Sequence, residues 1–325
     1  MANPVAPRIP GLVFLFPGQG SQATGMGKDL AFNHLVARRT FQEADDALGY
    51  SLSKLCFEGP DEKLRMTEIT QPAILTVSVA AARVLADDGI APSFVAGHSL
   101  GEYSAHVVAG TLSFADAVRT VRNRGKYMQE AVPVGVGAMA AILALSIDLI
   151  RSACSEAIAQ FPGQVCVPAN INSPGQVVIS GSKAAVERAA ELCKQKGAKR
   201  AVMLPVSAPF HCPLMQPAQD RLAVDLHALT FEAPQIPVMC NIEAAPVCDA
   251  AKSRDTLICQ VTGAVQWESS MRALIAKGAT QFLEAGPGAV LTGLLRQIDK
   301  AQGCVNVENE ASLQKAKAVF EVKQR

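Results

Sequence analysis

Residues 97–102, GHSLGE, have the residue types and spacing of a site for nucleophilic catalysis. The pattern G-x-S-x-G follows a short apolar run and precedes an Ala/Val-rich run at residues 103–109. A strand, a sharp turn and a helix in this order form a nucleophile elbow, in which glycines on both sides of the serine let the strand and helix pass closely. The N-terminus of that helix presents backbone N–H groups to an anion. This context favours Ser99 as a nucleophile over a chance match in a Gly/Ser-rich turn.

A second candidate is an arginine on the inward face of a predicted helix. Ser113, with Asp116 three residues later, is typical of a helix start. Apolar residues then recur at helical spacing, and Arg124 falls on their face, three residues after Val121. A buried guanidinium costs free energy unless an anion meets it. Two explanations follow: a structural ion pair with a core carboxylate, or a clamp for a carboxylate of the substrate.

If a histidine is the base that activates Ser99, it is one of the five in the chain. His98 adjoins the serine and is expected to line the pocket, but its side chain should point elsewhere. His211 lies on an irregular loop just before a predicted helix, which makes it the best candidate for the base. The alternative for His211 is a loop histidine that only binds backbone groups. The other three are expected to be surface or packing residues on helices: His34, His106 and His227.

The loop at residues 17–22, PGQGSQ, ends a continuous apolar run at residues 12–16. A run without alternation indicates a strand buried on both faces, as in a parallel sheet. The loop also fits the loose dinucleotide-binding pattern G-x-G-x-x-G/A, but that fold needs a second strand ending in an acid about twenty residues on. Here residues 30–48 are predicted to be a helix. The remaining use of this loop is to expose backbone N–H groups beside the active site, a role that suits Gln19.

The order of predicted elements indicates a small domain inserted into a larger one. Strands at 136–145, 165–171, 177–180 and 200–206 and helices at 147–160 and 183–196 give the order β-α-β-β-α-β, which is ferredoxin-like. We therefore expect a large α/β domain of residues 1–134 and 207–325 and a small domain of residues 135–206. The other predicted elements are helices at 71–88, 213–229, 267–277 and 289–298 and strands at 94–96, 236–240, 281–284 and 304–307.

Bulk composition limits the classes of function. The 325 residues are 49% hydrophobic, which is ample for a large core. The net charge of +1, without long runs of one sign, argues against nucleic acid or an anionic membrane as a partner. The apolar runs are shorter than a membrane span, and no secretory signal is visible. Nine scattered cysteines without a CxxC pair favour reduced thiols over disulfides or a metal site. We expect a cytoplasmic protein.

Six motifs occur along the chain in a fixed order: GQGSQ at 18–22, GHSLGE at 97–102, RGKYMQ at 124–129, PFH at 209–211, VQW at 265–267 and EAGPG at 284–288. Together they closely resemble the malonyl-CoA:acyl carrier protein transacylases of bacterial fatty acid synthesis. The resemblance covers nearly the whole chain. It implies an α/β-hydrolase-like large domain with an inserted ferredoxin-like small domain, in agreement with the element order.

The resemblance also implies a role for each site residue. Ser99 matches the serine that carries the acyl group, and His211 matches its catalytic histidine. Arg124 matches the arginine that holds the malonyl carboxylate. Gln19 and Leu100 match the residues whose backbone N–H groups form the oxyanion hole.

Gln260, within CQV at 259–261, matches the glutamine whose backbone carbonyl orients the catalytic histidine. A thiol is a good leaving group, so a carbonyl can replace the usual aspartate. The resemblance implies malonyl-CoA and a phosphopantetheine-bearing acyl carrier protein as substrates, transferred through a malonyl-serine intermediate. It implies no metal or redox cofactor, because the acyl group arrives activated. We expect a monomer.

Three alternatives stay open. A serine esterase would use Ser99, an acid such as Asp148, and His211, which follow the chain order of that class. A non-catalytic carrier-protein binder would have no reason to retain Ser99, His211 and Arg124 together. The same chemistry also serves stand-alone acyltransferases of polyketide synthase or malonate decarboxylase systems, and the motifs do not separate these pathways.

Overall fold

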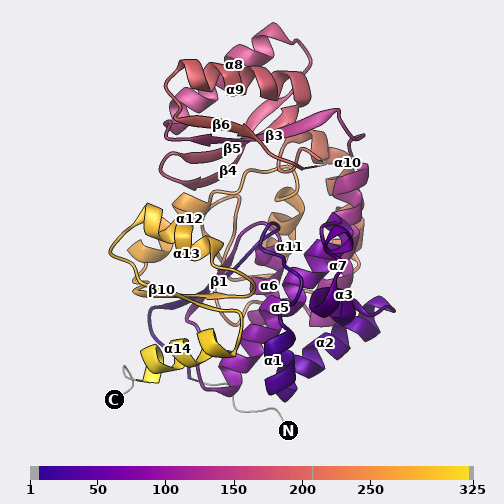
Figure 1. The fold of residues 1–325 in the computed structure, drawn as a ribbon, viewed down its shortest axis with the longest axis vertical. Helices are drawn as coiled ribbons and strands as arrows, with labels where there is room; N and C mark the ends of the chain where they lie inside the picture. The colour runs from indigo at the N-terminus through magenta and orange to yellow at the C-terminus, as the bar shows by residue number, and fades with distance from the viewer. Residues whose placement is uncertain (1–6, 207, 322–325) are drawn as a thin grey trace.

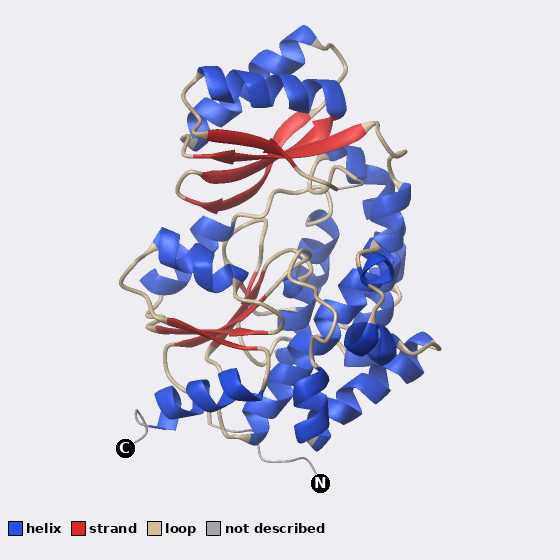
Figure 2. Ribbon diagram, viewed as in Figure 1, coloured by secondary structure: helices blue, strands red, loops and turns tan. Residues whose placement is uncertain are grey.

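The computed structural model describes residues 7–206 and 208–321, which form two sheets with helices packed around them (Figures 1 and 2). The larger sheet has the strand order β10-β9-β1-β2-β7-β8. Its first five strands run parallel and β8 runs antiparallel to β7, which confirms the predicted α/β class. The strands are β1 (Leu12–Phe16), β2 (Phe94–Gly97), β7 (Val238–Met239), β8 (Pro246–Val247), β9 (Gln281–Ala285) and β10 (Cys304–Val307).

Strand β1 lies at the centre of this sheet, and this position explains why its sequence is uniformly apolar. Leu12, Phe14 and Phe16 belong to the core on one face of the sheet, and Val13 and Leu15 belong to the core on the other. Side chains alternate between faces along a strand, so a strand covered on both faces needs apolar residues at every position. Because β1 pairs with β2 in parallel, the loops that follow both strands lie at the same edge of the sheet.

The helices of the larger part cover both faces of its sheet (Figure 1). Helix α5 is the one described helix long and apolar enough to span a membrane, but 83% of the apolar window is buried in the core. The helices are α1 (Lys28–Asn33), α2 (Leu35–Leu48), α3 (Leu52–Glu58), α4 (Asp61–Leu64), α5 (Thr67–Asp87), α6 (Gly101–Val108), α7 (Phe114–Glu130), α10 (Gln216–His227), α11 (Ala250–Cys259), α12 (Trp267–Ala276), α13 (Val290–Ile298) and α14 (Glu310–Glu321).

The smaller sheet is antiparallel and has the strand order β4-β5-β3-β6. Its elements follow the predicted β-α-β-β-α-β order: β3 (Gly137–Leu143), α8 (Ile147–Gln160), β4 (Cys166–Ser173), β5 (Gln176–Ser182), α9 (Lys183–Gln195) and β6 (Arg200–Met203). Helices α8 and α9 cover the outer face (Figure 1), so the other face turns toward the larger sheet. The domain boundaries at 135 and 206 stay a prediction.

Several predicted elements differ from the structure. The predicted helix 30–48 is two helices, because His34 is extended (φ −120°, ψ 123°) and its imidazole binds Glu310, 2.7 Å away. His34 is therefore a helix cap and not a residue within a helix. The predicted helix 213–229 begins as a 3₁₀ turn, Pro213–Met215, before α10. The helix predicted from residue 71 begins at Thr67, and the strand 236–240 shortens to β7. Elements that the sequence did not predict are α3, α4, α11, α14 and β8.

Candidate active site

Ser99 stands on a sharp turn between β2 and α6, as the motif predicts. Its φ of 52° lies in the left-handed region, which non-glycine residues seldom occupy. A Cβ at Gly97 would overlap the backbone of Gly101, and a Cβ at Gly101 would overlap the backbone of Phe16. The glycines are therefore needed for close approach of β2, α6 and β1. This backbone presents the Ser99 side chain at the edge where the parallel strands end.

His211 lies against the serine and is bound by backbone carbonyls on its other side. Its Nε2 is 2.7 Å from the Ser99 Oγ. Its Nδ1 is 2.9 Å from the carbonyl oxygen of Gln260 and 3.1 Å from that of Gly263. Because carbonyls only accept, Nδ1 carries the proton and Nε2 is free to accept the serine proton. Burial, helped by the positive charge of Arg124, lowers the pKa of His211 to about 3, so the imidazole is neutral at pH 7.

Among the described residues, no carboxylate contacts the Nδ1 of His211, where an esterase would place its acid. Asp148 lies on α8 with its side chain 88% exposed and pairs with Arg151, also on α8. Figure 1 shows α8 on the outer face of the smaller sheet, on the side away from the larger sheet. Within residues 7–206 and 208–321, only the two carbonyls contact the Nδ1 of His211. The esterase alternative therefore loses its proposed triad.

Arg124 is buried, with 1% of its surface exposed, and its guanidinium reaches the serine from α7. Nη2 donates to the Ser99 Oγ at 3.2 Å and to the Gln260 Oε1 at 2.9 Å. Nη1 donates to the Gln71 Oε1, also at 2.9 Å. These acceptors are neutral, and no described carboxylate forms an ion pair with Arg124. The structural ion pair is thus contradicted, and the positive charge is available to an anion in front of Ser99.

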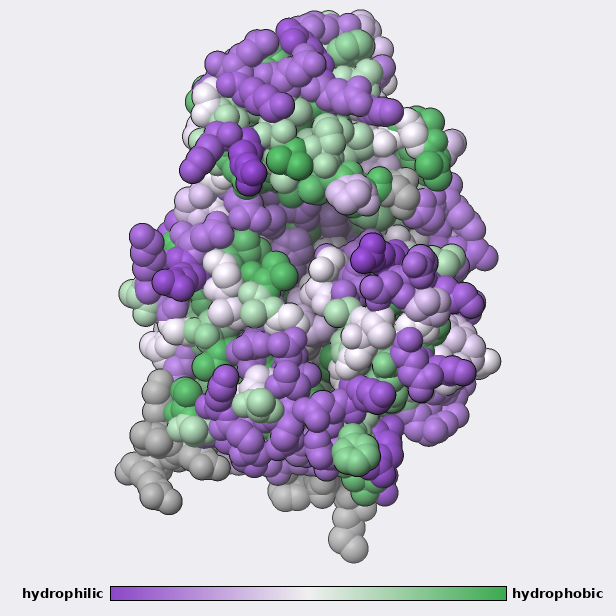
Figure 3. Space-filling model, viewed as in Figure 1, coloured by the Kyte–Doolittle hydropathy of each residue, from purple (hydrophilic) through white to green (hydrophobic). Residues whose placement is uncertain are grey.

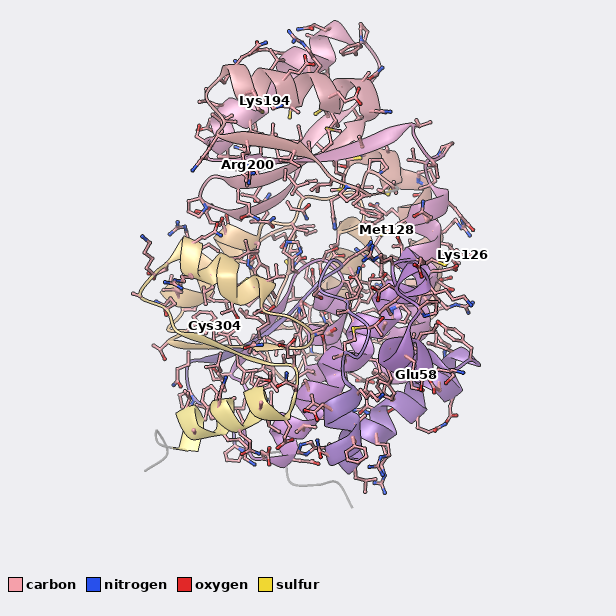
Figure 4. The ribbon with its side chains drawn as sticks, viewed as in Figure 1. Glu58, Lys126, Met128, Lys194, Arg200 and Cys304 are labelled. Carbon is pink, nitrogen blue, oxygen red and sulfur yellow. The ribbon has the colours of Figure 1, made fainter. Side chains whose placement is uncertain are left out.

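A cavity of about 300 Å³ opens in front of Ser99, between the two sheets. The surface is hollowed between the two parts of the molecule in the space-filling view (Figure 3). Figure 4 shows α7 beside this region, with Met128 toward the cavity and Lys126 at the outer edge of the molecule. Six predicted site residues line the cavity: Gln19, His98, Ser99, Leu100, Arg124 and His211. Gln260 is fully buried behind them.

Gln19 and Leu100 reach the cavity from the two adjacent strand ends. The pairing of Phe16 with Gly97 aligns the loop after β1 with the elbow. This alignment places Gln19 and Leu100 around the same space as Ser99. The arrangement is compatible with two backbone donors aimed at one oxyanion.

His98 lines the cavity but turns away from the serine. Its Nε2 is 2.8 Å from the Oδ1 of Asn172 on β4, so it connects the elbow to the smaller sheet. Its ring also lies 5.5 Å from that of Trp267, measured between ring centres. Burial lowers the pKa of His98. These contacts leave His211 as the described histidine that meets the Ser99 hydroxyl.

The sequence interpretation missed residues that support the site from behind. Asn241, which follows β7, accepts from the Ser99 N–H at 2.7 Å and donates to the Gly97 carbonyl at 2.7 Å, so it holds both ends of the turn. The Glu102 carboxylate accepts from the Asn241 N–H at 3.1 Å. In the sequence, Glu102 appears as the last residue of the GHSLGE motif, to which no separate role was assigned.

The structure shows no candidate metal centre in the part of the chain that it describes. Groups of three or more His, Cys, Asp or Glu side chains with suitable geometry are absent from the described residues.

Buried His106 lies on α6, as the packing interpretation predicted, and its ring nitrogens have no described partner.

Comparisons with known proteins agree on one family. The family model for the acyl transferase domain matches residues 13–319. A malonyl CoA-acyl carrier protein transacylase of Escherichia coli (strain K12) is 54% identical over 286 residues, which are 88% of this chain and 92% of that protein. A protein of the same name from Bacillus subtilis (strain 168) is 46% identical over 305 residues, covering 94% and 96% of the two chains.

Solved structures give the same result for the fold. The crystal structure of an acyl carrier protein S-malonyltransferase from Vibrio cholerae superposes with a TM-score of 0.92 at 49% identity, covering 94% of this chain and 100% of that one. A malonyl-transacylase solved in complex with a type II polyketide synthase acyl-carrier protein gives a TM-score of 0.91 at 49% identity, covering 94% and 98%. Both sheets of this chain therefore belong to a known two-part fold.

Proposed function

The chain belongs to the acyl transferase family of malonyl CoA-acyl carrier protein transacylases, and from this we propose the reaction and the role of each residue. The protein is an S-malonyltransferase: it moves the malonyl group from malonyl-CoA to the phosphopantetheine thiol of acyl carrier protein, supplying fatty acid synthesis. One observation carries the proposed mechanism. The Ser99 Oγ lies 2.7 Å from the Nε2 of His211 and 3.2 Å from the Nη2 of Arg124, so a nucleophile, a base and a cation meet in one cavity.

In the first half-reaction, Ser99 attacks the thioester carbonyl of malonyl-CoA while the Nε2 of His211 takes the hydroxyl proton. The backbone N–H groups of Gln19 and Leu100 stabilise the oxyanion, at roughly 3–4 kcal/mol for a donor in a comparable site. The tetrahedral intermediate then expels the CoA sulfur, which receives the proton from His211. A malonyl ester remains on Ser99.

In the second half-reaction, the carrier thiol attacks this ester and His211 accepts the thiol proton. Collapse of the intermediate returns the proton to the Ser99 oxygen and releases malonyl-acyl carrier protein. In both half-reactions the imidazolium is stabilised by the carbonyl oxygens of Gln260 and Gly263, which accept hydrogen bonds from the Nδ1–H of His211. The scheme uses no metal or redox cofactor, since a thioester is already activated. We propose that the enzyme works as a cytoplasmic monomer, without nucleic acid or membrane.

The rate of malonyl transfer to the carrier, compared with the rate of hydrolysis to malonate, distinguishes the proposed transferase from an esterase. Incubation with malonyl-CoA and phosphopantetheine-bearing acyl carrier protein should give malonyl-carrier faster than free malonate, as measured by intact mass of the carrier. Carriers from fatty acid and polyketide synthesis should be assayed in parallel, because one solved relative is bound to a polyketide synthase carrier. Release of malonate at the same rate with and without any carrier would contradict the transferase.

The proposed clamp predicts the effect of Arg124→Ala. Removing one partner of a buried ion pair costs about 3–5 kcal/mol, which is on the order of two to nearly four decades in a rate ratio. The ratio of kcat/KM for malonyl-CoA over acetyl-CoA should fall by about that factor, while acetyl transfer changes little, because acetyl carries no charge to pair.

Arg119→Ala is the matched control for this experiment. Arg119 lies on the same helix but is exposed and pairs with Asp116. Its removal takes away the same charge without touching the cavity, so the ratio should stay at the wild-type value. An unchanged ratio in Arg124→Ala itself would show that Arg124 does not bind the acyl carboxylate.

A further inference from the structure

Glu102 is a fully buried carboxylate to which the mechanism above gives no role. It is the second residue of α6, three positions after the nucleophile, and its surface is 0% exposed. Its Oε2 accepts from the Gln260 Nε2 at 2.6 Å and from the Asn241 N–H at 3.1 Å. Its Oε1 has no hydrogen-bond partner among the described residues. A buried carboxylate with one oxygen unpaired is costly, so a compensating use is expected.

The side chain of Gln260 connects this carboxylate to Arg124. Its Nε2 faces Glu102 and also donates to the Ser99 carbonyl at 3.0 Å. Its Oε1 accepts from the Arg124 Nη2 at 2.9 Å. An ionised carboxylate can only accept, so it fixes which end of the amide faces it. With Nε2 directed at Glu102, the amide oxygen of Gln260 faces Arg124 and can accept its hydrogen bond. In the reverse orientation, the amide N–H groups would face the N–H groups of the guanidinium, and no hydrogen bond could form.

The carboxylate and the guanidinium are near each other without forming an ion pair. Burial raises the pKa of Glu102 to about 7, while the hydrogen bonds from Gln260 and Asn241 and the charge of Arg124 act in the opposite direction. At pH 8 the group is therefore mostly ionised. A direct pair would occupy the N–H groups that a substrate carboxylate needs. Holding the negative charge one amide away balances Arg124 and leaves its Nε–H, which has no hydrogen-bond partner among the described residues, free for that carboxylate.

We propose that Glu102 is a positioning residue that orients the amide of Gln260, and through it Arg124, and so maintains the preference for an acyl group that carries a carboxylate. The inference rests on the proposed role of Arg124. It predicts that loss of the Glu102 charge weakens binding of the malonyl carboxylate but spares the Ser99 and His211 chemistry, because the Gln260 carbonyl that holds His211 belongs to the backbone.

Glu102→Gln tests this with a side chain of the same shape. A neutral amide both donates and accepts, so it no longer dictates the orientation of Gln260. At pH 8 the ratio of kcat/KM for malonyl-CoA over acetyl-CoA should fall by about tenfold, the scale of a hydrogen bond to a charged group. The loss should appear mainly as a higher KM for malonyl-CoA. In the Arg124→Ala background, Glu102→Gln should cause no further fall in the ratio, as a double-mutant cycle requires of residues that act together.

Glu284→Gln is the matched control. Glu284 is also 0% exposed, and its hydrogen bonds among the described residues are from Leu291 and Thr292, not from Gln260 or Arg124. Its replacement should leave the ratio unchanged. If Glu102→Gln does not fold, as judged by Tm, Gln260→Met removes the amide that links Glu102 to Arg124 and should lower the ratio similarly.

The possible outcomes separate this inference from the function on which it rests. If Arg124→Ala lowers the ratio but Glu102→Gln or Gln260→Met does not, Glu102 has no positioning role. If Glu102→Gln lowers the ratio as much in the Arg124→Ala background as alone, it acts by another route and the inference is overturned. If Arg124→Ala leaves the ratio unchanged, the proposed clamp itself fails.

Discussion

Ser99→Ala is expected to abolish the covalent malonyl adduct that malonyl-CoA alone leaves on the wild-type chain. The acyl-enzyme needs an oxygen at this position, and alanine supplies none while fitting the same turn. Ser99 has a φ of 52° and its N–H is held by Asn241, so the alanine backbone keeps the same support. We expect one malonyl group per chain in the wild type by intact mass, and none in the variant at an unchanged Tm.

The competing acyl acceptors are cysteine thiols, since the chain has nine of them. Cys212 is the nearest in sequence to the base, but it is buried and its Sγ donates to the Pro209 carbonyl. Burial raises the pKa of this thiol, which disfavours the reactive thiolate. Cys212→Ala is therefore a control that should keep the adduct. A malonyl adduct that survives in Ser99→Ala and maps to a cysteine would overturn the assignment of the nucleophile.

Local sequence patterns predicted the parts of this site that depend on neighbouring residues. The elbow could be identified because its glycines, serine and apolar flanks are contiguous, and the close contacts of Gly97 and Gly101 explain that pattern. Helical spacing placed Arg124 on a buried face, which the structure confirms with 1% exposure. Periodicity gives the direction of a side chain but not the identity of the group it meets.

The contacts that complete the site join residues far apart in the chain, and no local pattern encodes them. Asn241 holds the turn at Ser99 across 142 positions, and Gln71 meets Arg124 across 53. Both depend on how separate elements pack around the sheet. The break at His34 has a similar origin, because its partner Glu310 lies at the other end of the chain. Helix-forming residues on both sides of His34 concealed that break.

His211→Ala is expected to slow acylation of Ser99 by roughly 10²–10⁴-fold, the usual contribution of a general base. The 2.7 Å contact between Oγ and Nε2 is the path of the proton, and alanine leaves the hydroxyl without an acceptor. The measurement is the rate of the first turnover with acyl-CoA in the absence of carrier. His98→Ala should cost much less, since the Nε2 of His98 binds Asn172 and not the serine. Equal losses in the two variants would show that the wrong histidine was chosen or that both act together.

The pH profile gives an independent test of the same base. An imidazole can accept a proton only when neutral, and an unperturbed histidine would lose that form as the pH falls through about 6.5. Burial and the charge of Arg124 lower the pKa of His211 to about 3, so its neutral form persists far below that pH. With acetyl-CoA, whose acyl group does not need Arg124, the wild-type acylation rate should therefore stay level from pH 8 down to pH 5. A fall in rate centred near pH 6.5 would mean that the base is more exposed to solvent, or better paired when charged, than His211 is in this structure.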